Sequence, residues 1–193
     1  MPVQYSQFPS MLKNAIETTY ESIKDEGRAR SFYFDFLHKQ VVGYAQAAQI
    51  KEPPETIEHA VKAFLKEKII KGEIPCMKIY EDEHTLVFMD IAKDVDGHML
   101  VVPKKHITNI LDADEETLHH VMDTVKKVAN HCVSDCGYEG INMLNANNQC
   151  AGQTVFHLHI HLVPRQSGDS LPSFPKFGGA VHPLEETYKK LKI

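Results

Sequence analysis

The first third of the chain carries apolar residues at helical spacing. Between about residue 10 and residue 68, three runs place apolar side chains three or four positions apart, which is the repeat of one helix face. Gly27 interrupts the pattern after the first run. Pro53-Pro54 interrupts it after the second, because proline lacks a backbone donor and restricts the residue before it. We therefore expect three helices, one before Gly27, one over 29–50 and one over 55–68.

After Gly72 the pattern changes to short runs that are typical of strands. These runs predict strands over 77–83, 85–91, 98–103, 140–145 and 154–165. A single amphipathic helix interrupts them. It begins in the acidic stretch 112–116 and ends near Gly137, with apolar residues at every third or fourth position as far as Cys132. The pattern therefore predicts an α+β fold in which an all-helical region precedes a sheet with one long helix.

The last predicted strand contains three histidines. Because side chains alternate between the two faces of a strand, His157, His159 and His161 are expected to share one face. Apolar residues occupy the alternate positions and are expected to pack beneath the long helix. One histidine on a polar face is usually a structural residue, but three at strict alternation indicate a chemical role.

A metal site is one interpretation of the three histidines. Strand residues rise about 3.3 Å each, so His157 and His161 lie roughly 13 Å apart along the backbone. Zinc binds its nitrogen ligands at about 2.0–2.1 Å, so one ion can take two adjacent histidines, but all three only if the strand bends. The strand carries no Cys, Asp or Glu beside them. We therefore expect no metal ion and no cofactor.

Nucleophilic catalysis is the other interpretation, and we favour it. A neutral imidazole is a good nucleophile near pH 7 when its second nitrogen is hydrogen-bonded. The row of histidines supplies a central attacking group and flanking donors. The residues just upstream, Gly152, Gln153 and Thr154, offer backbone N–H groups, an amide and a hydroxyl for phosphoryl oxygens.

Charge and composition narrow the partners. The 193-residue chain has a formal net charge of −5, which does not favour binding nucleic acid by bulk charge but allows a small phosphate ligand. No signal-peptide pattern and no apolar run of about 18 residues is present. The four cysteines form neither a CxxC pair nor a disulfide framework. We therefore expect a cytoplasmic protein with no nucleic-acid partner and no membrane partner.

Several segments together resemble the histidine-triad (HIT) family. The stretch 151–165 contains the family signature His-φ-His-φ-His-φ-φ, where φ is apolar. Other segments resemble family motifs in the same order, namely 68–75, 80–84, 88–91, 97–107 and 140–142. The resemblance covers roughly residues 66–170. It divides the chain into a helical N-terminal extension of unknown role, 1–66, and a HIT-like catalytic domain, 67–193.

The resemblance implies a fold, an assembly and an activity. The family fold is an antiparallel sheet with a long helix, usually in a homodimer. The implied activity is hydrolysis or transfer of a purine nucleotide through a covalent nucleotidyl-histidine intermediate. His159 would attack the α-phosphate, while His157 and His161 would contact the phosphate and relay protons. His98 would lie behind the triad and orient it.

The resemblance also implies a nucleotide-binding set. Asp90 matches the acidic residue that binds the ribose hydroxyls. Gln153 and Thr154 match residues that hold the phosphate and the leaving group. Apolar residues fall where the family packs around a purine, namely Leu65, Ile69, Phe88, Ile91 and Leu100.

Two departures from the family pattern, and one feature of the triad, refine the resemblance. Ala146 stands where many members have Asn, eleven residues before the first triad histidine. The stretch 64–67 lacks the CxxC that forms part of a zinc site in many bacterial members, so a structural zinc is not expected. His161, rather than Gln, at the third triad position argues against the galactose-1-phosphate uridylyltransferase branch.

Three functions remain open from the sequence. The first is a phosphoramidase-like enzyme that acts on purine nucleoside phosphoramidates or related nucleotides. The second is a Fhit-like hydrolase of dinucleoside polyphosphates. The third is a nucleotide-binding adaptor, in which the helical N-terminal extension recruits a partner and turnover is incidental.

Overall fold

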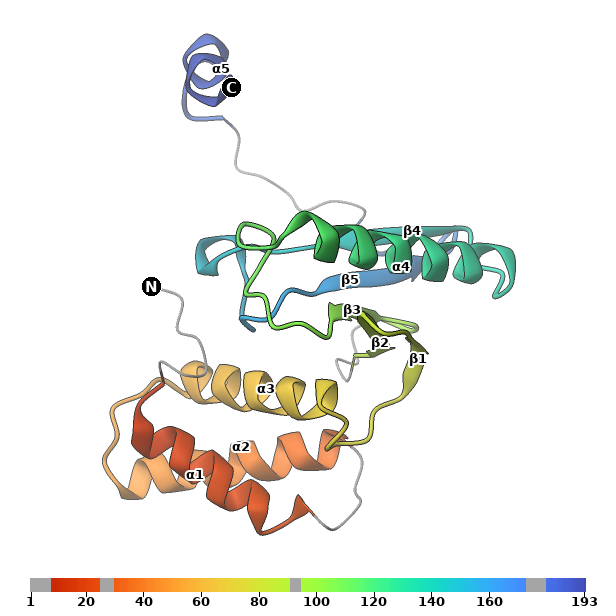
Figure 1. Ribbon diagram of the computed structural model, residues 1–193. Helices are drawn as coiled ribbons and strands as arrows, with labels where there is room; N and C mark the ends of the chain where they lie inside the picture. Colours follow the sequence, from red (N-terminus) through yellow and green to blue (C-terminus); the bar gives the residue numbers. More distant parts are fainter. Residues whose placement is uncertain (1–7, 25–29, 91–94, 173–179) are drawn as a thin grey trace.

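The N-terminal region consists of three helices (Figure 1). The computed structural model describes residues 8–24, 30–90, 95–172 and 180–193. The helices are α1 (Ser10–Glu21), α2 (Arg30–Ala47) and α3 (Pro54–Ile70). They confirm the three predicted helices, although the expected break at Gly27 falls outside the described residues. Pro54 begins α3 without a conflict, since the first turn of a helix needs no donor from proline.

The rest of the described chain forms a five-stranded antiparallel sheet with a long helix. The strands are β1 (Lys78–Glu81), β2 (Thr85–Met89), β3 (Met99–Pro103), β4 (Gly140–Leu144) and β5 (Ile160–Arg165), in the order β1-β2-β3-β5-β4. The helical elements are α4 (Glu115–Ser134), the short 3₁₀ helix η3 (Gln149–Ala151) and α5 (Leu184–Leu191). The predicted α+β fold is confirmed. Helix α5 was not predicted from the sequence, and all of its residues are exposed.

The two faces of the sheet are covered by different helices. Figure 1 shows α4 on one side of the sheet and α1–α3 on the other. Alternating residues of β2 and β3 point to the two sides. The cluster that includes α3 contains Leu86, Phe88, Leu100 and Val102. The cluster that includes α4 contains Val87, Met99, Val101, Ile160 and Leu162.

Helix α4 begins where the acidic stretch predicts a helix start. The Asp114 side chain caps it by accepting a hydrogen bond from the Thr117 backbone N–H at 2.9 Å. Glu115 and Glu116 lie in the first turn, where the helix dipole favours negative charge. Val121 and Val125 are among the residues on its buried face. The helix therefore covers the face of the sheet opposite α3.

The predicted strand over 154–165 is wrong in its first half. Strand β5 starts at Ile160, so His157 and His159 precede it and only His161 lies within it. Side-chain and loop contacts replace strand pairing there. The Leu158 N–H donates to the Ile107 carbonyl at 2.6 Å, and Asn145 Nδ2 donates to the His159 carbonyl at 2.9 Å.

The register of β5 places His161 on the α3 side of the sheet. His161 is opposite Leu100 in the pairing of β3 with β5, and Leu100 is opposite Phe88 in the pairing of β2 with β3. Directly opposite residues of antiparallel strands share a face. Since Leu100 and Phe88 pack with α3, the third triad histidine faces the same side as the helical extension.

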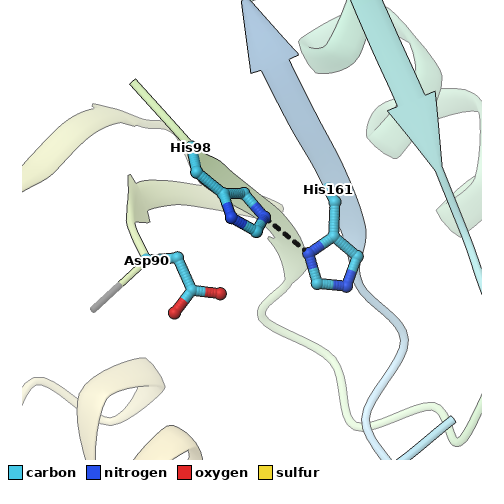
Figure 2. Close-up of side chains that lie close together, drawn as sticks. All are labelled: Asp90, His98 and His161. Atoms are coloured by element: carbon cyan, nitrogen blue, oxygen red, sulfur yellow. Dashed lines mark hydrogen bonds between the residues drawn. The ribbon is translucent and has the colours of Figure 1, made fainter. Parts of the chain in front are cut away.

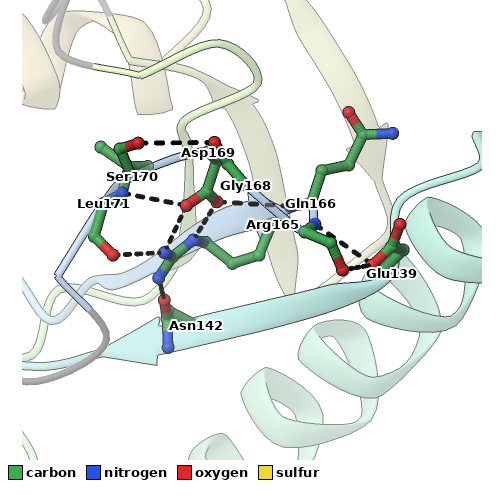
Figure 3. A network of polar contacts seen from close by, with 9 residues as sticks. Glu139, Asn142, Arg165, Gln166, Gly168, Asp169, Ser170 and Leu171 are labelled. Atoms are coloured by element: carbon green, nitrogen blue, oxygen red, sulfur yellow. Dashed lines mark hydrogen bonds and ion pairs between the residues drawn. The ribbon is translucent and has the colours of Figure 1, made fainter.

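An arginine anchors the chain after β5 (Figure 3). Arg165 Nε and Nη2 donate to the two carboxylate oxygens of Asp169, at 2.6 and 2.8 Å. The same guanidinium donates to the Leu171 carbonyl at 2.8 Å and to the side chain of Asn142 on β4. Bidentate arginine–carboxylate pairs fix both partners in orientation. The segment that follows the strand is therefore held against the sheet.

Among the residues that the structure describes, every helix is too short or too polar to cross a lipid bilayer.

The Arg165–Asp169 pair predicts a pH-dependent contribution to stability. Hydrogen bonds from Arg165 hold the pKa of Asp169 well below its usual range. A carboxyl whose pKa is lower in the folded state stabilises fully above its unfolded value of about 3.9, and this contribution is lost as the pH falls. Asp169→Asn should therefore lower the melting temperature at about pH 7, and the difference from wild type should narrow below about pH 4.

Calorimetry over this pH range measures the effect, with Asp123→Asn, on the exposed face of α4, as a matched control. A difference between wild type and Asp169→Asn that stays constant with pH would contradict the assignment.

Candidate active site

His159 is held as one tautomer by a backbone carbonyl. Its Nδ1 lies 2.7 Å from the carbonyl oxygen of His157, and a carbonyl can only accept, so Nδ1 carries the proton. In a neutral imidazole the other nitrogen, Nε2, then has a free lone pair. The His159 side chain is buried. The geometry therefore presents an oriented nitrogen nucleophile inside the protein.

His157 is fixed by the opposite arrangement. Its Nε2 donates to the Pro103 carbonyl at 2.8 Å, so its Nδ1 is the unprotonated nitrogen. Nδ1 of His106 lies 3.1 Å from that nitrogen and is the donor of the pair. His157 therefore supplies the carbonyl that orients His159, while its own ring is tied to the end of β3 and to His106.

His161 pairs with a fourth histidine (Figure 2). Nε2 of His98 lies 2.8 Å from Nδ1 of His161, and one of the two nitrogens carries the proton. The His161 ring centroid is also 5.0 Å from that of His159. The Asp90 carboxylate lies beside the pair. Asp90 directly follows β2 and His98 directly precedes β3, and the Asp90 N–H donates to the His98 carbonyl at 2.9 Å. The structure thus brings together all four predicted catalytic histidines and Asp90.

Burial keeps two triad histidines neutral. Loss of hydration lowers the pKa of His157 to about 4 and that of His159 well below its usual value. The positive charge of Lys66 acts in the same direction on both rings, while their hydrogen bonds to the backbone oppose the shift. Neutral imidazoles keep the lone pair that a nucleophile needs.

The predicted purine-binding residues lie where α3 meets the sheet. Ile69, Phe88 and Leu100 are buried, together with Leu65, in the cluster that joins α3 to β2 and β3. They share the side of the sheet on which His161 lies. Ile91, the remaining apolar candidate, falls outside the described residues.

The two predicted phosphate-binding residues differ in environment. Gln153 is buried, and its amide is engaged within the protein: Nε2 donates to the carbonyls of Thr108 and Val155, and Oε1 accepts from Asn148 and Asn109. A phosphate at this amide would have to displace one of these partners. Thr154 is exposed beside the triad segment. Thr154 therefore lies at the surface, whereas Gln153 is enclosed.

Three supporting residues were not among the predicted site residues. Asn145, next to Ala146, donates to the carbonyl of His159, and His106 donates to His157. Lys66 of α3 exposes only 3% of its surface and acts electrostatically on the triad. The asparagine-rich stretch 145–148 was a visible signal for the first. The lysine gave none, because its helix pattern does not show which lysine is buried.

A cavity of about 680 Å³ opens beside the triad segment. Its walls come from α1 and α3 of the extension and from the segments that carry His106 and His157. Charged residues on its helical walls are Lys13, Glu17 and Glu67. The extension therefore forms part of the surroundings of the first triad histidine.

One group in the described part of the chain has the geometry of a metal site. One ligand atom each from Asp90, His98 and His161 lies within 4.8 Å of the others. Carboxylate and imidazole are suitable zinc ligands. The spacing of three histidines along a straight strand disfavours a single ion bound by all of them, but this group contains only the last triad histidine.

The comparisons with known proteins decide the family. A model of the HIT domain matches residues 71–168. This chain belongs to the HIT-domain family. An uncharacterised HIT-like protein from Methanocaldococcus jannaschii is 41% identical over 126 residues, which cover 65% of this chain and 95% of that protein. An adenosine 5′-monophosphoramidase from Schizosaccharomyces pombe is 36% identical over 131 residues, covering 65% of this chain and 96% of that protein.

Solved structures agree with this HIT-domain assignment. The crystal structure of a HIT family member from Bacillus subtilis matches with a TM-score of 0.57 at 37% identity, covering 65% of this chain and 89% of that chain. The HIT domain match begins after the last residue of α3. The three helices of the extension therefore lie outside the matched domain, although α3 packs directly on its sheet.

The buried histidines predict an unusual titration. A histidine whose pKa is lowered by folding stays neutral while the unfolded chain, with a pKa of about 6.5, takes up protons. The His157 imidazole should titrate near pH 4, and the pKa of His159 should lie well below its ordinary value. Because both rings stay neutral in the folded state, the free energy of unfolding should decrease as the pH falls below about 6.5.

Nuclear magnetic resonance of the imidazole carbon-bound protons measures these midpoints, with His157→Gln used to assign the His157 signal. Midpoints near the ordinary value of about 6.5 for both rings would contradict a buried neutral pair.

Proposed function

We propose that this protein hydrolyses the phosphorus–nitrogen bond of purine nucleoside phosphoramidates through a nucleotidyl adduct on His159. The observation that carries the proposal is the 2.7 Å contact between His159 Nδ1 and the His157 carbonyl. It leaves Nε2 as an oriented lone pair in a buried site. The S. pombe relative named as an adenosine 5′-monophosphoramidase supports the choice of substrate.

The reaction proceeds in two displacements at the α-phosphorus. First, His159 Nε2 forms a bond to phosphorus while the phosphorus–nitrogen bond breaks, and the departing amine takes up a proton. Next, water attacks the same phosphorus, gives a proton to His161 and displaces Nε2, which yields the nucleoside monophosphate and the free imidazole. A covalent intermediate divides one difficult step into two easier ones.

The neighbouring histidines have separate roles in this scheme. His161 donates the proton that the leaving amine takes up, and its 2.8 Å hydrogen bond to His98 holds its ring in place. His157 orients the nucleophile through its carbonyl. The exchange of one proton between paired imidazoles requires only small movements of atoms, since the rings are already in hydrogen-bonding contact.

The nucleotide itself is assigned to the α3 side of the sheet. The Asp90 carboxylate binds the ribose hydroxyls, because it lies beside His98 and His161 at the edge of the site. The purine lies against the margin of the apolar cluster formed by Ile69, Phe88 and Leu100. Thr154 contacts the phosphate or the leaving group from the exposed side of the triad segment.

Removal of the nucleophile tests the proposal. With adenosine 5′-monophosphoramidate as substrate, His159→Ala should lower kcat/KM by at least about 10³-fold, because no other group replaces the attacking nitrogen. His119→Ala, on the exposed face of α4, serves as the matched control and should keep the wild-type rate.

The same assay distinguishes the other functions. Turnover of a diadenosine polyphosphate in preference to the phosphoramidate would favour the dinucleoside polyphosphate hydrolase. Binding of AMP without turnover of either substrate would favour the adaptor. Unchanged activity in His159→Ala would remove His159 from the mechanism.

A further inference from the structure

Three metal-ligating side chains converge at the last triad histidine. One ligand atom each from Asp90, His98 and His161 lies within 4.8 Å of the others, and Figure 2 shows the carboxylate beside the two rings. Among the residues that the structure describes, this is the one group of three or more such side chains with that spacing. A carboxylate and two imidazoles form a ligand set that zinc binds in proteins.

The sheet brings these three side chains to one face. Asp90 lies two residues after Phe88 of β2, and alternation places both on the same side. His98 lies two residues before Leu100 of β3, which is directly opposite His161 of β5. Phe88 and Leu100 both pack in the cluster that includes α3. The backbone of three strands therefore positions the carboxylate and the two rings without the help of an ion.

Distances within the group suit a zinc ion after small movements. Zinc bonds to nitrogen and oxygen are about 2.0–2.2 Å long, so two ligands of a tetrahedral ion lie roughly 3.3–3.6 Å apart. The facing nitrogens, Nε2 of His98 and Nδ1 of His161, are 2.8 Å apart, so the two rings must separate by about half an ångström. Since all ligand atoms lie within 4.8 Å, the Asp90 oxygen must move by no more than about 1.5 Å.

Both rings can present a lone pair to the same ion. One proton joins the two facing nitrogens, and a neutral imidazole can carry its proton on either nitrogen. When the donating ring moves its proton to its other nitrogen, both facing nitrogens can coordinate a metal. His98 is buried, whereas Asp90 and His161 are half-buried, so the group is reachable from solvent.

We propose that Asp90, His98 and His161 form a zinc site, and that Zn²⁺ and nucleotide exclude each other there. The exclusion rests on the proposed function, in which Asp90 binds the ribose and His161 donates a proton. Zinc is thereby a reversible inhibitor of the proposed reaction. Three protein ligands leave the fourth position of the ion to water. Mg²⁺ does not replace Zn²⁺, because it requires nearly octahedral oxygen ligands.

Zinc binding to the full chain tests the site without turnover. Competition with a chromogenic chelator gives the dissociation constant for wild type and for Asp90→Asn, which keeps the shape of the side chain but removes its negative charge. Asp135→Asn is the matched control, because Asp135 pairs with His131 at 2.7 Å at the exposed end of α4. That pair offers zinc a carboxylate and an imidazole outside the proposed site.

We expect Asp90→Asn to weaken zinc binding at least about tenfold, because one of the three protein ligands loses its charge. Asp135→Asn should change the zinc dissociation constant by less than about twofold. Saturating adenosine should weaken zinc binding to wild type at least about tenfold, since it occupies Asp90 and carries no phosphate that chelates the ion. Equal zinc binding by wild type and Asp90→Asn would overturn the site, and simultaneous binding of zinc and adenosine would overturn the exclusion.

A second measurement uses the wild-type protein, in case Asp90→Asn does not fold. One equivalent of Zn²⁺, but not of Mg²⁺, should shift the ring-proton nuclear magnetic resonance signals of His98 and His161, assigned with His98→Gln and His161→Gln. The signals of His131 should not move. Unchanged signals from both His98 and His161 would overturn the proposal. Neither titration needs a substrate, so absence of phosphoramidate hydrolysis would refute the proposed function while these readouts still decide the zinc site.

Discussion

The hydrogen bond from His159 Nδ1 to the carbonyl of His157 is the interaction on which the site depends. A hydrogen bond of this kind contributes only about 1 kcal/mol net, but it selects one tautomer of a buried ring. The carbonyl can face that ring because residues 157–159 leave the strand ladder and find other partners. Ile107 accepts from the backbone N–H of Leu158, and Asn145 donates to the carbonyl of His159. The irregular backbone before β5 is therefore part of the arrangement that orients the His159 ring.

The sheet register connects this local geometry to the rest of the molecule. The pairing of His161 with Leu100 places His161 on the face covered by α3, while α4 covers the opposite face. Two separate apolar clusters form on the two sides as a result. The extension consequently contributes to the core and also forms part of the wall of the cavity beside His157. In the two relatives described above, the match covers 65% of this chain.

The sequence predicted the regular elements well and the irregular ones poorly. Helical spacing and the Pro53-Pro54 break identified the three N-terminal helices, because each buries one apolar face. The alternation of histidines and apolar residues continues through His157 and His159, but the backbone pairing of the strand begins only at Ile160. The predicted last strand was therefore too long. The exposed α5 buries no apolar face and so gave no clear pattern. The proposed boundary between residues 66 and 67 falls inside α3 and stays a prediction. The roles of the site residues, the homodimer and the cytoplasmic location also stay predictions.

The stereochemical course at phosphorus tests the central claim, which is that His159 becomes covalently bound to the nucleotide. The substrate is an adenosine 5′-phosphoramidate made chiral at phosphorus by one sulfur, and the solvent is water enriched in heavy oxygen. Each displacement inverts the configuration, so the two displacements through His159 predict overall retention. Phosphorus nuclear magnetic resonance of the product reads the configuration. Overall inversion would show that water attacks the substrate directly, and it would contradict the account.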